Sequence, residues 1–271
     1  MLPKSHEAWY DSFIETKAEG AMKRELNLIL QCAHIFLENG SETYRAEEIA
    51  EFTARGLGIE QINVLALPTG VFITVTDAAG AEHSALKRTK KRGTNLELLD
   101  RVNDLSRRVA SGALTLDGAE RELAALNTAK AFDPRLTCLA ATLSSGFFAL
   151  LFGGGFSDFV TACLCGFVVQ CVAMALRRQK IYSFMVSLIG GMVIACFALL
   201  ATELFHFGSM EAIIAGAMMP LLPGLMMTNG VRDTMNGDLV SGVARTAEAV
   251  LIAVALAAGA GCAIWLFYVI R

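Results

Sequence analysis

The front of the chain shows the hydrophobic spacing of helices. Between residues 23 and 40, apolar residues recur every three or four positions and predict one face of a helix that ends at Gly40. A second helix is expected over 41–58, with Ser41 as its N-terminal cap. The apolar positions that define the first helix are Leu26, Leu30, Ala33 and Leu37.

Three short runs rich in strand-forming residues follow, separated by the turns 68–70 and 78–80. Helices are then expected at 95–112 and 116–126, the second opening with Asp117 and Glu120 as a capping box. This order predicts a small α/β domain in which a meander sheet packs on helices. The expected strands are 62–67, 71–77 and 82–88.

The second part of the chain contains five apolar segments, each near the ~20 residues that cross a bilayer as a helix. We therefore expect a membrane protein in which a small α/β domain, 1–134, is followed by a five-helix transmembrane bundle, 135–271. The glycine pairs 190–191 and 259/261 favour close helix packing. The expected spans are 136–152, 157–176, 181–202, 210–229 and 239–268.

Composition agrees with this division. The 271 residues are 54% hydrophobic with a mean hydropathy of +0.50, and most charges lie in the front domain. The start of the chain lacks a signal peptide, so the front domain is expected in the cytoplasm. With it inside, the basic connections are inside too, which predicts an external C-terminus. These connections carry Arg135, Arg177, Arg178, Lys180 and Arg232, and the alternate ones carry Asp158, Glu203 and Glu211.

Several partners and cofactors are not expected. A net charge of −3 does not indicate nucleic-acid binding, and the basic run 87–92 is typical of a solvated cytoplasmic face. Most of the seven cysteines lie in apolar segments, and the four histidines are scattered, so we expect neither a disulfide framework nor a metal site. In the turn 68–70, Thr69 has no base at a fixed spacing, and the front domain carries no nucleotide signature.

The fourth apolar segment should be broken. Pro220 and Pro223 cannot donate backbone hydrogen bonds, and Gly224 follows them directly. Broken backbone at membrane depth is tolerated where it lines a cavity, and discontinuous helices often form transport sites. A simple proline kink is the alternative.

Polar residues follow this break at helical spacing. The pairs Thr228/Arg232 and Asn229/Asp233 are each four residues apart. Ionisable residues near a span suggest an ion or substrate path, and Arg245 could bind a carboxylate with both sides of its guanidinium. A structural ion pair between Arg245 and Glu248 is the alternative. One stripe of the next helix holds Asp238, Ser241, Arg245 and Glu248.

Four stretches of this sequence together resemble the motifs of one known protein family. "NGSETYRAEE", "LPTGVFITV", "RVNDLSRRVASG" and "PLLPGLMMTNGVRDTMNGDLVSGVARTAEA" resemble the bacterial threonine/serine exporter family, in its short, N-terminal-domain-like branch. The similarity runs from about residue 22 to the end. Its front-domain positions are Gly40, Glu42, Thr43 and Arg45, and Pro68, Thr69 and Gly70 in the second stretch.

The resemblance implies an exporter of small carboxylate metabolites in the inner membrane. Full-length members carry about five more spans, whereas this chain resembles shorter members that work with a separate small membrane subunit and are implicated in succinate export. It therefore implies threonine, serine or a dicarboxylate as substrate, a second subunit and an oligomer. Asp233, Asp238 and Glu248 are the candidate proton carriers.

Two other functions are compatible with the layout. The front domain could be a hydrolase that the spans tether to the membrane, although it shows no catalytic constellation. It could also bind a ligand as a sensor and gate the spans. An anchor, however, needs no charged stripe, which favours the transporter.

Overall fold

The structure, a computed structural model, describes residues 5–90, 93–127 and 133–271 and forms two compact units. The first unit comprises Met1–Ala129 together with Thr228–Arg245. The second comprises Lys130–Met227 together with Thr246–Arg271. A stretch from the apolar half of the sequence therefore packs as part of the polar unit.

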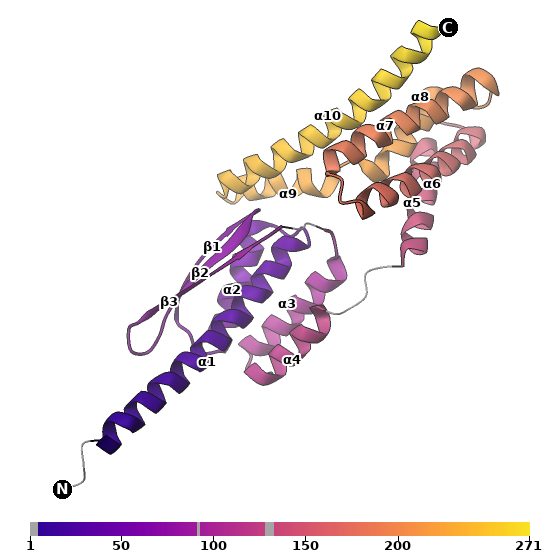
Figure 1. Ribbon diagram of the computed structural model, residues 1–271. Coiled ribbons are helices and arrows are strands. Elements are labelled where there is room, and N and C mark those ends of the chain that lie inside the picture. The colour runs from indigo at the N-terminus through magenta and orange to yellow at the C-terminus, as the bar shows by residue number, and fades with distance from the viewer. Residues whose placement is uncertain (1–4, 91–92, 128–132) are drawn as a thin grey trace. The chain divides into compact units, whose positions relative to one another are not determined.

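The first unit contains the predicted sheet. Its strands run antiparallel in the order β1-β2-β3, with Leu65 opposite Phe72 and Phe72 opposite Leu86. The helices lie to one side of these strands (Figure 1), so the predicted meander and its helical cover are confirmed. Its elements before residue 130 are α1 (Ser5–Glu38), α2 (Thr43–Gly56), β1 (Gln61–Leu67), β2 (Gly70–Thr76), β3 (Glu82–Arg88), α3 (Leu96–Ala110) and α4 (Leu116–Asn127).

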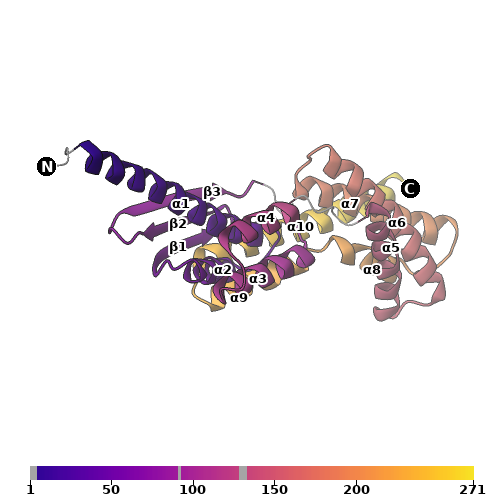
Figure 2. The ribbon, with the colours of Figure 1, turned by 90° about the horizontal axis from the view of Figure 1, so that it is seen from below.

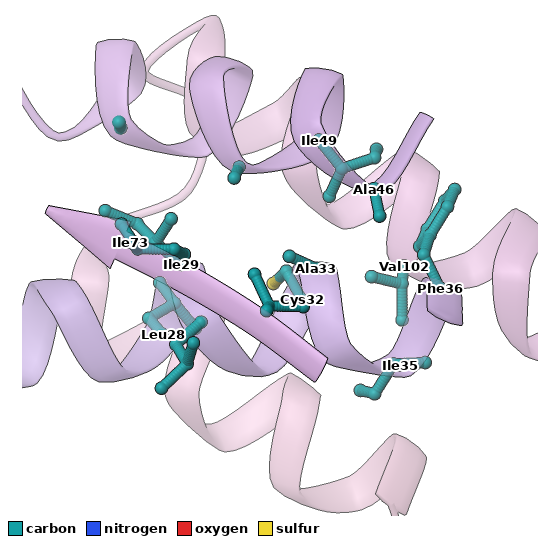
Figure 3. Close-up of a cluster of buried hydrophobic side chains, with 14 of the residues drawn as sticks. Leu28, Ile29, Cys32, Ala33, Ile35, Phe36, Ala46, Ile49, Ile73 and Val102 are labelled. Carbon is teal, nitrogen blue, oxygen red and sulfur yellow. The ribbon is translucent and has the colours of Figure 1, made fainter. Parts of the chain in front are cut away.

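Alternation along β2 separates an inner from an outer face of the sheet. Val71, Ile73 and Val75 are at most 1% exposed, whereas Phe72 is 45% exposed. Figure 3 shows Ile73 beside Ile29 of α1, within the main core of this unit. The hydrophobic period of each element thus decides which face enters the core.

Two predicted helix caps, Ser41 and Asp117, are wrong. Helix α2 begins at Thr43 after Glu42, and Ser41 instead directs its hydroxyl to the Glu42 carboxylate at 3.3 Å. Helix α4 begins at Leu116, so Asp117 lies inside it and does not cap it. Asp117 and Glu120 both bind Arg24 of α1, which draws them away from their own backbone.

The second unit is helical in its described part. Helices α5, α6 and α8 pack together (Figure 2). Its elements are α5 (Pro134–Leu151), α6 (Phe156–Arg178), α7 (Ser183–Leu199) with the π-turn η1 (Leu200–Leu204), α8 (Met210–Met218) with the 3-10 turn η2 (Met219–Leu221), and parts of α9 (Gly224–Met235) and α10 (Leu239–Ile270).

Among the described residues, four helices are long and apolar enough to cross a membrane. The pair Met210–Leu221 and Gly224–Met235 makes a fifth span only if the two are counted together, since they bend by 60° at the break. The break predicted at Pro220 and Pro223 is therefore present. The chain has four or five candidate spans.

Small residues let helices of the second unit approach closely. A Cβ on Gly191 would lie 2.1 Å from the Leu256 carbonyl oxygen, and one on Gly259 would lie 2.0 Å from that of Leu188. Helices α7 and α10 therefore touch backbone to backbone. Gly261, expected to share this role, has nothing within 4 Å of its Cβ position, because it lies on the other side of α10.

Candidate functional site

A tight turn joins α9 to α10 inside the first unit. Gly237 adopts a φ of 95°, which favours glycine, and the Asp238 N–H donates to the Asp233 carbonyl at 2.9 Å. A Cβ on Gly242 would lie 2.1 Å from the hydroxyl of Thr234, so α10 passes very close to α9. This turn brings together polar side chains that lie far apart on the two helices.

Asp233 is the centre of the resulting cluster. Its carboxylate is fully buried and accepts hydrogen bonds from the Thr43 backbone N–H at 3.0 Å and the Thr43 hydroxyl at 2.9 Å. Thr43 is the first residue of α2, so Asp233 places a negative charge at the positive end of that helix. This explains why α2 needs no cap from its own flanking side chains.

Each of the three residues before Thr43 contacts a side chain of α9 or α10. Asn229 donates to the Gly40 carbonyl at 2.6 Å, and Arg245 donates to the Ser41 carbonyl at 2.7 Å. Arg232 forms an ion pair with the Glu42 carboxylate. The segment 40–43 is thus held by four side chains of α9 and α10.

Arg245 and Asp233 form a buried ion pair. Their atoms Nε and Oδ2 are 3.1 Å apart, and the side chains are 9% and 0% exposed. Removal of one partner from such a pair leaves an uncompensated buried charge, which is strongly unfavourable. Arg245 therefore forms an ion pair with Asp233, and its pairing with Glu248 stays a prediction.

The surrounding carboxylates have shifted pKa values. Burial alone would raise the pKa of Glu42, but its own backbone N–H together with Arg232 and Arg45 lowers it below the usual value. Burial raises the pKa of Glu47. Among the neighbouring charged groups, Asp238 raises this pKa most. Burial and then Asp233 raise the pKa of Asp238 in the turn.

The predicted residues divide into three groups. One group forms the cluster, and Ser241 is buried beside it on α10, whereas Asp238 and Glu248 are half-buried. A second group is at the helix break, in the second unit. The cluster group is Glu42, Thr43, Asn229, Arg232, Asp233 and Arg245; the break group is Pro220, Pro223 and Gly224.

The remaining predicted residues lie outside the cluster. Thr228 is exposed at the beginning of the α9 part of the first unit, and Arg45 is exposed on α2. In the turn between β1 and β2, Pro68 is buried, the Thr69 carbonyl accepts the Thr89 N–H at 2.9 Å, and a Cβ on Gly70 would lie 2.8 Å from a carbonyl oxygen. These backbone contacts join the turn to the end of β3, which is a structural role.

Three features of the site were missed from the sequence: two backbone carbonyls and one glutamate. The carbonyls of Gly40 and Ser41 accept hydrogen bonds, and backbone acceptors leave no side-chain signal. Glu47 accepts the Ala66 N–H at 2.8 Å. Because Glu47 lies four residues after Thr43, on the same helical face, the spacing could have identified it.

The arrangement offers a carboxylate and a guanidinium in a buried setting. A ligand carboxylate would have to compete with Asp233 or with the Ser41 carbonyl for Arg245. Among the described residues, no group of three or more His, Cys, Asp or Glu side chains could hold a metal ion. The described residues of the cluster therefore offer ion pairing and hydrogen bonding.

Residues 27–267 match the family model described as "Putative threonine/serine exporter". A "Probable succinate transporter subunit YjjP" of Klebsiella aerogenes is 24% identical over 86% of this chain and 90% of its own. The protein of that name from Escherichia coli K12 is 22% identical over 91% and 94%. No solved structure matches the chain.

A longer relative also matches. The "Threonine/serine exporter" of Corynebacterium glutamicum is 25% identical over 89% of this chain but only 51% of its own length. The family description and these names indicate a transporter and not an enzyme, which sets aside the membrane-tethered hydrolase. With its apolar helices and a family match over most of its length, this chain belongs to the threonine/serine exporter family of multi-pass membrane proteins.

Proposed function

We propose that this chain is one subunit of a proton-coupled secondary exporter of small carboxylate metabolites. Its substrate is threonine and serine, or a dicarboxylate such as succinate, as the names of its relatives suggest. A second small membrane subunit completes the transport path, consistent with the word "subunit" in two of those names. The front domain, 1–134, faces the cytoplasm, and the C-terminus faces the periplasm.

The buried Asp233–Arg245 pair is the observation that carries this proposal. Charged side chains are rarely buried, and a buried ion pair is weak evidence for a role in stability alone. Here both lie on the two helices that pass from the first unit into the second. A charge change at this pair would therefore act on helices shared by both units.

The substrate carboxylate would compete with Asp233 for Arg245. Guanidinium groups bind carboxylates through two parallel hydrogen bonds, so the exchange replaces one ion pair by another of similar geometry. Released Asp233 would also lose its contact with Thr43 at the start of α2. Substrate binding would thus loosen the segment 40–43 from α9 and α10.

A proton can take part in the same exchange. Asp233 without Arg245 would be a buried carboxylate that has lost its cation, which is strongly unfavourable. Asp238, whose pKa is already raised, is a second acceptor within the turn. One proton per substrate would then keep the cluster neutral while Arg245 is occupied.

Transport in reconstituted membranes tests the proposal. The chain would be placed in proteoliposomes with and without the adjacent-gene membrane subunit, and efflux of labelled threonine, serine and succinate would be measured under a pH gradient. We expect efflux of one of them only with both subunits, and its loss in Arg245→Lys and Asp233→Asn. Arg101→Ala, an exposed arginine of α3, is the matched control.

Two results would contradict the proposal. Unchanged efflux in Arg245→Lys would remove Arg245 from the substrate path. Efflux that ignores the pH gradient, with normal substrate dependence, would remove the proton. A fusion reporter at the C-terminus tests the predicted orientation independently.

A further inference from the structure

The outer face of the sheet carries an unusual row of side chains. Leu65, Phe72 and Leu86 lie directly opposite one another on the three strands. They are 54%, 45% and 54% exposed. Large apolar side chains in one cross-strand row form a continuous patch, and such patches mark interaction sites.

Basic side chains adjoin this row. Arg88, two residues after Leu86 and therefore on the same face, is exposed, as is Lys90. They belong to the basic run 87–92, whose last two residues lie outside the described part of the chain. At the opposite end of the same face, the exposed residues are Gln61 and Glu82. The face thus changes from acidic and polar to apolar and basic along the strands.

The apolar and basic end is the one nearest the α9–α10 turn within the first unit. Ala66, next to Leu65, donates to Glu47, which lies one helical turn after the Thr43 that binds Asp233. Gly93, which follows the basic run, donates to the Glu38 carbonyl at 2.8 Å, two residues before Gly40. Both ends of the 40–43 segment therefore connect to this end of the sheet.

The first unit ends on helix α10 at Arg245. Helix α10 continues without interruption from Arg245 over Thr246–Ile270. That part is about 37 Å long at 1.5 Å per residue, enough for the ~30 Å hydrocarbon core. Helix α10 is therefore long enough to cross a membrane, which makes a bilayer surface an available partner for this chain.

We propose that the row Leu65–Phe72–Leu86, with Arg88 and Lys90, rests against anionic lipid headgroups of the membrane that α10 crosses. Charge complementarity selects this occupant, because apolar side chains flanked by Lys and Arg match the acyl and headgroup layers of an anionic surface. The contact fixes how the front unit is held at the bilayer surface.

Photo-crosslinking in the full-length chain tests the contact. A benzophenone amino acid replaces Phe72 in one variant and Gln61 in another, and Gln61 is exposed on the same face roughly 13 Å along the strand. The chain is placed in nanodiscs of phosphatidylglycerol and phosphatidylcholine, or of phosphatidylcholine alone. After irradiation, the mass of each adduct identifies what was contacted.

We expect lipid adducts at position 72 in the anionic nanodiscs and few at position 61. The yield at 72 should fall about fivefold for each charge removed in Arg88→Gln and Lys90→Gln, corresponding to ~1 kcal/mol per basic residue at an anionic surface. Adducts to a second copy or to another protein, an equal yield in phosphatidylcholine alone, or no adduct at 72 would each overturn the proposal. Phe72 is a surface residue, and correct folding is checked by an unchanged melting temperature.

Discussion

The two units differ in where they place their large hydrophobic side chains. In the first unit, large aliphatic and aromatic side chains such as Phe36 and Ile73 are buried, and most of the described charged side chains outside the Asp233 cluster are not. In the second, large side chains such as Phe156 and Trp265 are 79% and 66% exposed, while glycine and alanine fill the helix contacts. Water drives the first arrangement, whereas helices in lipid gain from close backbone approach.

The segment Thr228–Arg245 joins these two regimes. It lies between apolar helices in the sequence, yet it packs in the first unit through hydrogen bonds and an ion pair to the segment 40–43. Hydropathy alone therefore does not define the border between the units. The hydrogen-bond partners of a segment also decide to which unit it belongs. Four predictions test this comparison, beginning with the largest effect.

Asp233→Ala should be the most damaging substitution. It removes two hydrogen bonds at the start of α2 and leaves the Arg245 guanidinium buried without its carboxylate, which should lower the free energy of unfolding by about 3–5 kcal/mol. Thermal unfolding in detergent micelles would measure the change. Asp100→Ala, on the exposed side of α3, should change little. Equal melting temperatures for the two variants would show that the cluster does not hold the segment.

Ile73→Ala and Phe72→Ala test the two faces of the sheet. Ile73 is 1% exposed, so its truncation should cost about 2–5 kcal/mol, whereas Phe72→Ala in detergent should cost much less. Denaturant unfolding followed by far-ultraviolet circular dichroism would compare them. A larger loss for Phe72 would mean that the outer face is covered within the protein.

Gly259→Ala and Gly261→Ala test the packing of the second unit. The new methyl group on Gly259 would collide with the Leu188 carbonyl and should cost about 1–3 kcal/mol. Gly261 has open space, so alanine should be neutral or stabilise α10 by up to about 1 kcal/mol through helix propensity. Melting temperatures in nanodiscs would separate them, and the opposite order would reverse the assignment of the α10 faces.

Glu42 and Glu47 of the first unit should show small pH effects of opposite sign. The pKa of Glu42 is lowered in the folded state, so its contribution to stability is present above the ordinary value of 4.5 and is lost as the pH falls through the folded pKa. The pKa of Glu47 is raised, so its contribution is present below 4.5 and is lost as the pH rises through the folded pKa. Glu42→Gln should therefore destabilise at neutral pH, and Glu47→Gln should not.

Melting temperatures between about pH 3 and 8 would test both glutamates. The difference between Glu42→Gln and the unmodified chain should shrink as the pH falls, whereas Glu47→Gln should gain relative stability as the pH rises. Parallel curves for all three proteins would contradict both shifts.

Local patterns predicted most of the elements in the described residues. The strand pattern at 71–77 and the prolines at 220 and 223 act within a few residues, so period and backbone chemistry were sufficient to place β2 and the break. The start of α2 was missed because its cap comes from Asp233, 190 residues away. A rule based on neighbouring residues cannot identify a partner so far away in the sequence.

The candidate site shows the same limit. The spacing of Asn229 with Asp233 and of Ser241 with Arg245 correctly indicated shared helix faces. The backbone of Gly40 and Ser41 packs on those faces. This could not be inferred, because every residue carries the same carbonyl group and the sequence does not show which one accepts a hydrogen bond.

The sequence by itself determined where apolar surface is made, where helices break and which polar residues share a stripe, since these follow from periodicity and backbone geometry. Only the tertiary structure decided that the segment 40–43 occupies that stripe and that Thr228–Arg245 belongs with the polar unit. The physical reason is that a buried charge is stable only with its partner, and the partner's identity depends on how distant parts of the chain meet.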